Sequence, residues 1–335
     1  MTATFAINGF GRIGRLVFRA WLESGRKDCE IVAINDLAPL ETNAHLLQYD
    51  SVHGRLPYEV TTEGNDILKV NGHKVKVYSQ RNLEDIPRTD NGVDVVLECT
   101  GIFTKKEDAG KHLNHGAKKV LISAPSPDAD LLVVYGVNHD KLEASHTVVS
   151  NASCTTNCLA PVAHVLHQAI GIEQGFMTTI HSYTGDQRIV DTAHKDLHRA
   201  RAGALNMIPT STGAAKAVGK VLPELNGKLD GVSIRVPTPN VSVVDFKFNA
   251  SKDTTVEEVQ EAIKKAANGD LKGILGTYDA PLVSSDFIHD KHSSVFALNE
   301  VKVMDGRLVR ILSWYDNEWG FSNRMLDTAT LMASK

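Results

Sequence analysis

A glycine-rich turn near the N-terminus constrains the fold of this chain more than any other feature. Residues 4–7 form a short apolar run, and residues 13–21 place apolar side chains at helical spacing. Gly9, Gly11 and Gly14 lie between this predicted strand and this predicted helix. In such a turn the first glycine permits a sharp bend, the second lets a pyrophosphate approach the backbone, and the third allows the helix to pack closely on the strand. The pattern therefore predicts a dinucleotide-binding site.

The start of the predicted helix and the end of the next strand support a cofactor site. Arg12 and Ile13 open the helix, whose free N–H groups would face the phosphates. Asp36 ends the predicted strand 31–35 and lies 36 − 14 = 22 residues after Gly14. A carboxylate at this spacing accepts hydrogen bonds from ribose hydroxyls and repels a 2′-phosphate, which favours NAD over NADP. A glycine turn can serve packing alone and an aspartate can be a loop or cap residue, but the two signs together favour the cofactor.

The distribution of apolar runs predicts two different sheets. In the first half, short runs alternate with polar or helical stretches, at residues 31–34, 93–97, 120–122 and 147–149. After about residue 150 the runs become longer and partly alternating, at residues 176–180, 232–236, 241–248, 295–303 and 308–314. Residues 256–267 form an amphipathic helix with acids in its first turn and lysines in its last. We predict an α/β protein: a Rossmann-type doubly wound parallel sheet plus an α+β catalytic domain with a mostly antiparallel sheet.

The composition is typical of a soluble globular protein. The 335 residues, 42% hydrophobic and 23% charged, are enough for two domains with buried cores. The formal net charge of -4 gives no general attraction to nucleic acid or to a membrane surface, so neither is expected as a partner. The chain has no apolar run of about 18 residues and does not start with a basic leader. Because four cysteines are too few for a disulfide framework, we expect a protein of the reducing cytoplasm.

Cys154 is the candidate nucleophile. An apolar strand at residues 148–149 runs through small polar residues into Cys154, which would lie at the N-terminus of a helix. There the helix dipole favours the thiolate, and the hydroxyls of Ser153 and Thr155 offer hydrogen-bond donors. His181 ends another apolar strand and begins a polar segment, so its neutral imidazole could take the thiol proton if the two residues meet.

The other three cysteines have a structural interpretation. Free cysteines in protein cores usually behave as small apolar side chains, and this is the interpretation of Cys29 and Cys99. Cys158 lies one helical turn beyond Cys154, but Leu159 and Ala160 flank it and the influence of the helix terminus fades there. We therefore expect Cys158 to be structural, with a minor redox role as the alternative.

Several longer strings resemble one enzyme family. Residues 150–158, SNASCTTNC, resemble the active-site signature of the glyceraldehyde-3-phosphate dehydrogenase family. Further matches follow in the family's order: INGFGRIGR at 7–15, YDSVHG at 49–54, CTGIF at 99–103, HSYTGDQ at 181–187, PTSTGAAKAV at 209–218, RVPTPNVSVVD at 235–245 and SWYDNEWGFSNR at 313–324. The resemblance covers essentially the whole chain, and motifs of this length are jointly very specific.

The resemblance implies a phosphorylating, NAD-dependent aldehyde dehydrogenase of glycolysis and gluconeogenesis. Such an enzyme reversibly converts D-glyceraldehyde 3-phosphate, NAD and inorganic phosphate to 1,3-bisphosphoglycerate. Cys154 would attack the aldehyde to form a hemithioacetal, NAD would take the hydride, and phosphate would release the resulting thioester. His181 would act as the base. The resemblance also implies a cytoplasmic homotetramer.

The resemblance further implies two anion pockets and a set of cofactor residues. Thr184 and Arg235 match the pocket for the substrate's phosphate, and Arg199 would lie between the two pockets. The pocket for the attacking phosphate is matched by Ser153, Thr155, Thr212 and Gly213. The cofactor positions are Gly9, Gly11, Arg12, Ile13, Gly14, Asp36, Arg81, Ser123 and Asn317. Without the resemblance, Arg199 would be assigned to a solvated helix face and residues 211–213 to a simple loop.

The resemblance divides the chain into two domains and leaves two other functions open. An NAD-binding Rossmann domain would comprise residues 1–152, with a C-terminal helix at 318–335 returning to it, and a catalytic domain would comprise residues 153–317. One alternative is an erythrose-4-phosphate dehydrogenase, which shares the thiol chemistry but accepts a longer sugar and transfers the acyl group to water. The other is a binding protein that carries RNA or another partner on the dinucleotide groove, although such a protein would not need the catalytic residues.

Overall fold

The computed structural model describes residues 2–86 and 92–335. The chain divides into two compact units. The first contains Met1–Val133, His139–Ala152 and Ser322–Lys335, and the second contains Val134–Asn138 and Ser153–Phe321. Among the described residues, no helix combines the length and the apolar character needed to cross a bilayer.

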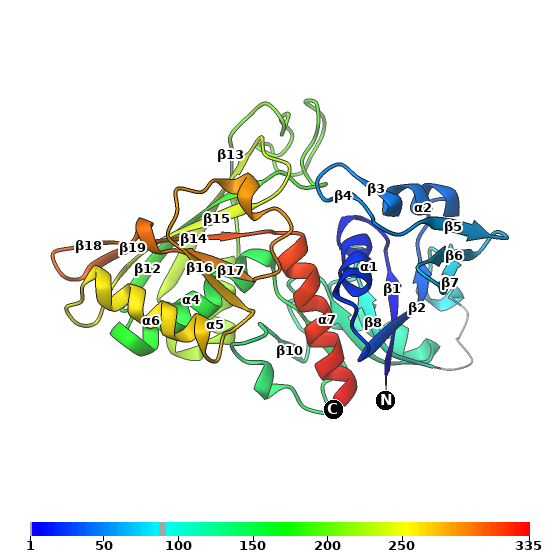
Figure 1. The fold of residues 1–335 in the computed structure, drawn as a ribbon, viewed down its shortest axis with the longest axis horizontal. Coiled ribbons are helices and arrows are strands. Elements are labelled where there is room, and N and C mark those ends of the chain that lie inside the picture. The colour runs from blue at the N-terminus through cyan, green and yellow to red at the C-terminus, as the bar shows by residue number, and fades with distance from the viewer. Residues whose placement is uncertain (1, 87–91) are drawn as a thin grey trace. The chain divides into compact units, whose positions relative to one another are not determined.

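The first unit is built on a nine-stranded sheet with the order β10-β11-β9-β8-β1-β2-β7-β6-β5 (Figure 1). Its strands are β1 (Ala3–Asn8), β2 (Cys29–Asn35), β5 (Val60–Glu63), β6 (Ile67–Val70), β7 (His73–Tyr78), β8 (Val93–Glu98), β9 (Ala117–Ile122), β10 (Leu131–Leu132) and β11 (Val148–Ser150). The pairs from β10 through to β7 are parallel, whereas β7, β6 and β5 pair antiparallel. This confirms the predicted doubly wound parallel sheet.

The strand order reverses beside β1. The chain passes from β1 through α1 (Arg12–Ser24) to β2 on one side and later reaches β8 on the other side. The carboxyl ends of β1 and β8 therefore flank the point at which the strand order reverses. Open α/β sheets bind their ligands at this point.

The remaining elements of the first unit are helices, single turns and one two-stranded sheet. They are α2 (Leu40–Gln48), the pair β3 (Tyr49–Asp50) and β4 (Gly54–Arg55), η1 (Leu83–Asp85), α3 (Lys106–Ala109), η2 (Gly110–His115), η3 (His139–Lys141) and most of α7 (Trp319–Ser334). The sequence interpretation expected only polar or helical structure between the second strand and residue 93, and it missed β5, β6 and β7. These strands are short, and β5 is largely exposed, so they lack the apolar run that marks a buried parallel strand.

The second unit contains an eight-stranded sheet with the order β13-β14-β12-β15-β19-β17-β16, and β18 also pairs with β19. The strands are β12 (Gln174–Ser182), β13 (Ile208–Ser211), β14 (Leu229–Val236), β15 (Ser242–Asn249), β16 (Leu275–Tyr278), β17 (Ser294–Ala297), β18 (Lys302–Met304) and β19 (Leu308–Tyr315). Two pairs, β12 with β14 and β16 with β17, are parallel, and the others are antiparallel. The predicted mostly antiparallel sheet is therefore confirmed.

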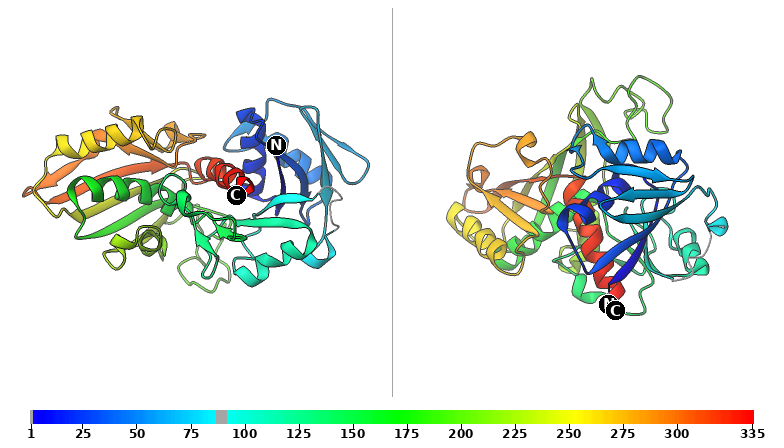
Figure 2. Two further views of the ribbon diagram at one scale, coloured as in Figure 1. Left: turned by 90° about the horizontal axis from the view of Figure 1, so that it is seen from below. Right: turned by 45° about the vertical axis from the view of Figure 1, so that its right-hand side comes forward.

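Three helices cover one face of this sheet (Figures 1 and 2). They are α4 (Cys154–Ile170), α5 (Ala214–Val221) and α6 (Val256–Asn268), accompanied by the single turns η4 (Pro223–Leu225), η5 (Ser284–Phe287) and η6 (Leu298–Glu300). α6 begins with a capping box, in which the Thr255 hydroxyl accepts from the Glu258 N–H and the Glu258 carboxylate accepts from the Thr255 N–H. The predicted helix at residues 256–267 is confirmed.

The predicted single strand at residues 295–303 is wrong. β17 ends at Ala297, η6 follows, and β18 begins at Lys302. β17 pairs with the carboxyl-terminal part of β19 and β18 with its amino-terminal part, so one apolar run contributes two strands to the same partner.

Candidate active site

Cys154 is the first residue of α4. The Ser153 hydroxyl caps this helix by accepting a hydrogen bond from the Thr156 N–H at 3.0 Å. Ala152, just before the cap, has a φ of 58°, a conformation that L residues seldom adopt and that ordinarily needs support from the surrounding structure. The thiol therefore lies at a helix N-terminus and is only partly buried.

His181 lies within reach of the Cys154 thiol. The Cys154 Sγ to His181 Nε2 distance is 3.5 Å. The other ring nitrogen, Nδ1, lies 2.7 Å from the Ser182 carbonyl oxygen, which can only accept a hydrogen bond. Nδ1 therefore carries the proton in the neutral ring, and Nε2 presents a lone pair to the thiol. This is the arrangement that a base for Cys154 requires.

Arg235 places a positive charge beside the imidazole. Its Nη1 donates to the Ser182 carbonyl at 3.2 Å and to the Thr184 hydroxyl at 3.3 Å, and it approaches His181 Nδ1 to 3.2 Å. Burial, with help from this cation, lowers the pKa of His181 to about 3. Burial raises the pKa of Cys154, whereas Arg235 and the hydrogen bonds from Thr155 act in the opposite direction. The imidazole is therefore neutral where it faces the thiol.

Tyr315 supports the site from β19 and was missed by the sequence interpretation. Its hydroxyl lies 2.8 Å from the hydroxyls of both Thr155 and Thr179, and its ring meets the His181 ring edge-on. Tyr315 is buried and links the start of α4 to β12.

The residues predicted for the substrate's phosphate are partly brought together. Thr184 and Arg235 are in contact, and Arg235 Nε is buried with no protein partner among the described residues. An anion would satisfy this donor. Arg199 instead donates from Nη1 to Asp186 at 2.7 Å and from Nε to the Thr210 hydroxyl at 2.9 Å. The structure gives Arg199 no contact with Cys154.

The residues predicted for the second anion meet at two helix starts. The Thr156 hydroxyl lies 2.8 Å from the Ser153 hydroxyl and 3.5 Å from the Ala214 carbonyl, so the starts of α4 and α5 are adjacent. Gly213 is the N-cap of α5, and the Thr212 hydroxyl accepts from the Ala214 N–H at 3.2 Å. Two helix N-termini with hydroxyl side chains form an anion-binding environment.

The glycine turn of the first unit has the predicted construction. A Cβ on Gly9 would lie 2.7 Å from the Thr100 nitrogen, and one on Gly14 would lie 2.1 Å from the Gly9 carbonyl oxygen. A Cβ on Gly11 would meet nothing within 4 Å. Gly11 is also the N-cap of α1, whose first turn contains no acidic residue. The turn therefore leaves open space in front of a helix N-terminus, which fits a pyrophosphate.

Asp36, the residue predicted to bind the ribose, is hydrogen-bonded to this turn. One Asp36 oxygen accepts from the Phe10 N–H at 2.7 Å, and the other accepts from the Ala38 N–H at 2.9 Å.

Arg12 forms an ion pair with Asp50 at 2.5 Å. Burial raises the pKa of Asp50, but hydrogen bonds from the backbone and from Arg12 outweigh this effect and lower the pKa to about 2.

The other predicted cofactor residues lie in several places. Ile13 follows Arg12 in α1 and is partly buried. Arg81 is exposed just after β7, and Ser123 follows β9 with its N–H donating to the Glu98 carbonyl at 3.0 Å. Asn317 belongs to the second unit, where its Oδ1 accepts from the hydroxyls of Ser182 and Ser242 at 2.9 Å each. This fixes the orientation of the amide, because Oδ1 is the atom that accepts from the two serines.

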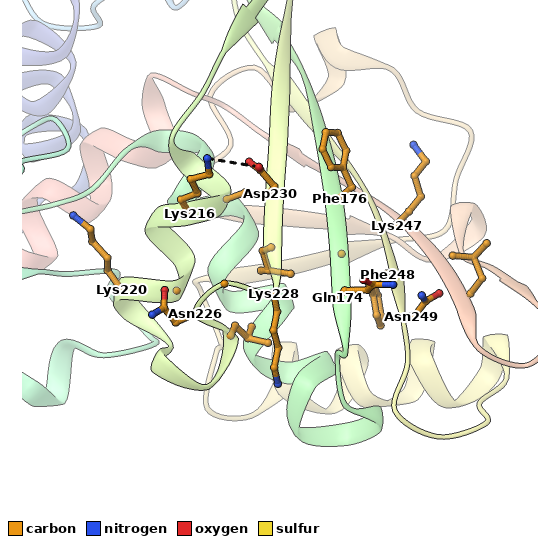
Figure 3. A pocket seen from close by; sticks show the side chains of 17 residues that line it. Gln174, Phe176, Lys216, Lys220, Asn226, Lys228, Asp230, Lys247, Phe248 and Asn249 are labelled. Carbon is orange, nitrogen blue, oxygen red and sulfur yellow. Dashed lines mark ion pairs between the residues drawn. The ribbon is translucent and has the colours of Figure 1, made fainter.

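A separate groove of about 730 Å³ lies on the second unit (Figure 3). Lys216, Lys228 and Lys247 contribute to its wall, and Lys216 pairs with Asp230 at 3.6 Å. Phe176 lines the same groove. The groove contains neither the thiol nor the imidazole, so it is not the candidate active site.

Together these features define a class of protein: a dinucleotide-dependent dehydrogenase that works through a cysteine. Comparison with known families then specifies which one. The NAD binding domain of glyceraldehyde 3-phosphate dehydrogenase matches residues 3–106, and the C-terminal domain of the same enzyme matches residues 153–317. The chain belongs to the glyceraldehyde-3-phosphate dehydrogenase family.

Curated relatives match over almost their whole length. Glyceraldehyde-3-phosphate dehydrogenases from Cereibacter sphaeroides and Xanthobacter flavus are 68% and 66% identical over 332 residues, which is 99% of this chain and 99% of each relative. The enzyme of Geobacillus stearothermophilus is 56% identical over 336 residues, covering 100% of this chain and 99% of the relative. The predicted family and the predicted NAD cofactor are thereby confirmed.

Proposed function

We propose that this protein is an NAD-dependent glyceraldehyde-3-phosphate dehydrogenase. It reversibly oxidises D-glyceraldehyde 3-phosphate in the presence of inorganic phosphate to 1,3-bisphosphoglycerate. The observation that carries the proposal is the position of His181 Nε2, 3.5 Å from the Cys154 sulfur at the start of α4. This pair supplies a nucleophile and its base in a family that the whole sequence matches.

The residues of the second unit account for the thiol chemistry. His181 Nε2 takes the Cys154 proton as the sulfur attacks the aldehyde carbon and returns it to the aldehyde oxygen, so that a hemithioacetal with a hydroxyl group forms and the ring is neutral again. NAD, when bound, accepts a hydride from the hemithioacetal carbon. His181 removes the hydroxyl proton of the hemithioacetal, so that a thioester remains on Cys154. Arg235 limits protonation of the resting imidazole, since its charge lowers the His181 pKa.

Two anion sites hold the reactants. The buried Nε of Arg235, with the Thr184 hydroxyl beside it, binds the phosphate of the substrate. Inorganic phosphate binds at the adjacent starts of α4 and α5 and attacks the thioester carbon, which breaks the bond to Cys154 and releases the acyl phosphate. The Cys154 sulfur regains the proton that His181 holds. The ligands of the inorganic phosphate are Ser153, Thr155, Thr212 and Gly213. Arg199 serves one of these anions after exchanging its contact with Asp186. Holding both reactants turns a three-body encounter into a positioned reaction.

The cofactor residues divide between backbone and side-chain roles. Backbone N–H groups of the turn that contains Gly9, Gly11 and Gly14 bind the pyrophosphate, with Arg12 and Ile13 at the start of α1. The Asp36 carboxylate accepts from the ribose hydroxyls. Arg81, Ser123 and Asn317 complete the set, and the Nδ2 of Asn317 donates to the nicotinamide carboxamide. In the proposed domain division, residues 1–152 and the returning helix 318–335 form the NAD-binding domain, and residues 153–317 form the catalytic domain.

A homotetramer is the proposed assembly. On the sheet face opposite the helices, the apolar side chains of Phe176, Val232 and Leu308 are 48%, 41% and 41% exposed. Asp230 and Lys247, the ladder partners of Phe176, add both charge signs to this face. A half-apolar face with both charges fits a second copy of itself across a two-fold axis. The four free thiols agree with the reducing cytoplasm as the proposed location.

The test follows NADH absorbance with glyceraldehyde 3-phosphate and NAD, with and without inorganic phosphate. Phosphate-dependent NADH formation is expected, and Cys154→Ser should lower kcat by about 10³-fold or more because the hydroxyl is a far poorer nucleophile. Cys158→Ser is the matched control, since the Cys158 thiol is buried one turn further along α4. This variant should keep its activity.

Two results would contradict the proposal. Equal or faster turnover of erythrose 4-phosphate without inorganic phosphate would favour the erythrose-4-phosphate dehydrogenase alternative. Absence of turnover with either sugar phosphate, together with retained NAD binding, would favour a binding protein on the dinucleotide groove.

A further inference from the structure

A buried hydrogen-bonded network joins the carboxyl ends of neighbouring strands in the first unit. The sheet order β8-β1-β2-β7 places Glu98, Asn8 and Asn35 at three adjacent strand ends. Asn8 is the ladder partner of both Glu98 and Asn35. All three residues are buried, and Glu98 is only 1% exposed. These ends flank the reversal of strand order beside β1.

The Glu98 carboxylate is the centre of the network. Its Oε2 accepts from Asn8 Nδ2 at 2.6 Å and lies 3.0 Å from His112 Nε2. An ionised carboxylate only accepts, so this ring nitrogen of His112 carries a proton. Oε1 accepts from the Thr100 N–H at 2.9 Å and from the Thr100 hydroxyl. Four donors compensate for burying the charge, which would otherwise be strongly unfavourable.

Asn8 extends the network to two more strands. Its Oδ1 accepts from Asn35 Nδ2 at 2.8 Å. The same Asn35 amide donates to the Gln80 carbonyl at 2.9 Å and accepts from the Gln80 N–H at 2.9 Å. One continuous chain of hydrogen bonds therefore runs from β8 across β1 and β2 to Gln80, two residues past the end of β7.

The network lies directly beneath the proposed cofactor residues. Three of its members immediately precede one of them: Asn8 before Gly9, Asn35 before Asp36, and Gln80 before Arg81. The Glu98 carbonyl also accepts from the Ser123 N–H at 3.0 Å. The turns after β1 and β8 touch, because a Cβ on Gly9 would lie 2.7 Å from the Thr100 nitrogen. The Cys99 N–H also donates to the Asn8 carbonyl at 2.7 Å, so the two turns are joined by a backbone hydrogen bond.

We propose that Glu98 is a positioning residue of the dinucleotide site. Its carboxylate holds the turns after β1 and β8 at a fixed separation through Asn8 and Thr100, so that their N–H groups are pre-organised for the cofactor. Without this acceptor, NAD binding has to order the two turns and loses affinity. The inference rests on the proposed function, since it assumes that these turns bind NAD.

Glu98→Gln is the test variant, with NAD affinity measured by isothermal titration calorimetry. The glutamine keeps the size and an oxygen for Thr100, but it turns an amide NH₂ toward the donors of Asn8 and His112. We expect NAD to bind about tenfold more weakly. Because the thiol site belongs to the other unit, kcat at saturating NAD and the KM for glyceraldehyde 3-phosphate should stay within about twofold of wild type.

Asp94→Asn is the matched control. Asp94 lies on the same strand and also links β8 to β1, since its Oδ2 accepts from the Thr4 N–H at 2.8 Å. This link is at the amino ends of the two strands, away from the proposed cofactor turns. The control should lose thermal stability without losing NAD affinity, which separates positioning from a general weakening of the sheet.

A double variant supplies the rescue. Asn8→Asp combined with Glu98→Gln exchanges donor and acceptor between the two residues, so their hydrogen bond can re-form and NAD affinity should largely return. Where Glu98→Gln does not fold, His112→Leu removes one of the four donors and should weaken NAD binding about threefold.

The outcomes distinguish the role of Glu98 from the proposed function. Wild-type affinity in Glu98→Gln or His112→Leu would overturn the inference, and so would equal affinity losses in Glu98→Gln and Asp94→Asn. These results would leave the proposed function intact. A wild-type protein that does not bind NAD would overturn the proposed function itself.

Discussion

His181 shows how one buried residue couples catalysis to the stability of the second unit. Burial and the nearby charge of Arg235 lower its pKa to about 3 from an ordinary value of 6.5. The folded protein therefore keeps the ring neutral where the unfolded chain would protonate it. A neutral ring is what the proposed mechanism needs, because only Nε2 without a proton can accept from Cys154.

Because the His181 pKa is shifted, we predict that this residue lowers the free energy of unfolding in acid. Between pH 6.5 and 3 the unfolded chain binds a proton that the folded chain does not, so the contribution of His181 is complete above pH 6.5 and declines below it. pH 5 lies 1.5 units below the ordinary His181 pKa of 6.5. At about 1.4 kcal/mol per unit, the expected loss in the free energy of unfolding relative to pH 7.5 is about 2 kcal/mol. Urea unfolding at both pH values should show this loss in wild type and a smaller one in His181→Asn. Equal losses would contradict the prediction.

The site residues that were found from the sequence and those that were missed differ in how far along the chain their signals or partners lie. Cys154 and His181 lie where an apolar run stops and a polar segment begins, a signal contained within a few neighbouring residues. Tyr315 and Glu98 end ordinary strands, and their partners lie far away: Thr155 is 160 residues from Tyr315, and Asn8 is 90 residues from Glu98. Only the folded sheets bring such pairs together. The roles of the individual site residues stay predictions.

At the scale of elements, the turn before α1 separates glycines that serve the fold from one that serves the ligand. A Cβ on Gly14 would overlap the Gly9 carbonyl, whereas a Cβ on Gly11 would point into open space. Gly11 has a φ of -71°, which alanine adopts readily. The two positions therefore fail for different reasons when substituted.

Two alanine variants test this separation. Gly14→Ala should lower the free energy of unfolding by about 2 kcal/mol or more, because backbone must shift to admit the methyl group. Gly11→Ala should change stability by less than about 0.5 kcal/mol yet weaken NAD about tenfold, since the methyl group occupies the approach of the pyrophosphate. Thermal unfolding and calorimetric NAD titration of both variants measure this. Wild-type NAD affinity in Gly11→Ala would show that the cofactor does not approach this glycine.

Predictability of the elements followed their burial. Parallel strands such as β8 and β9 were found because each contains a run of three buried apolar residues, Val95–Leu97 and Val120–Ile122. The strands at Val60–Tyr78 were missed because they are short and alternate with polar or exposed residues, so they contain no such run. Residues 295–303 were predicted as one strand, since apolar residues on both sides of the turn at Leu298–Glu300 gave a partly alternating pattern. Fold class depends on the buried strands, and it was confirmed.

At the scale of the whole molecule, the sheet of the second unit leaves one face for a partner. Residues of β12 alternate: Met177 and Thr179 are buried on the helix side, while Phe176 is exposed on the other. Val232 of β14 lies on the same exposed face, next to Thr178 in the ladder. A second copy that covers this face would bury these apolar side chains. Assembly would then contribute to the stability of each chain.

Light scattering coupled to size exclusion tests whether this face assembles the protein. Wild type should have about four times the 36.5 kDa mass of the chain, as a homotetramer requires. Val232→Glu should give a smaller species, because a carboxylate buried between two sheets without a partner is strongly unfavourable. Lys264→Glu is the control, since Lys264 is exposed on α6, on the covered side of the sheet. Unchanged mass in Val232→Glu would place the interface elsewhere, and a wild-type mass of one chain would contradict the tetramer.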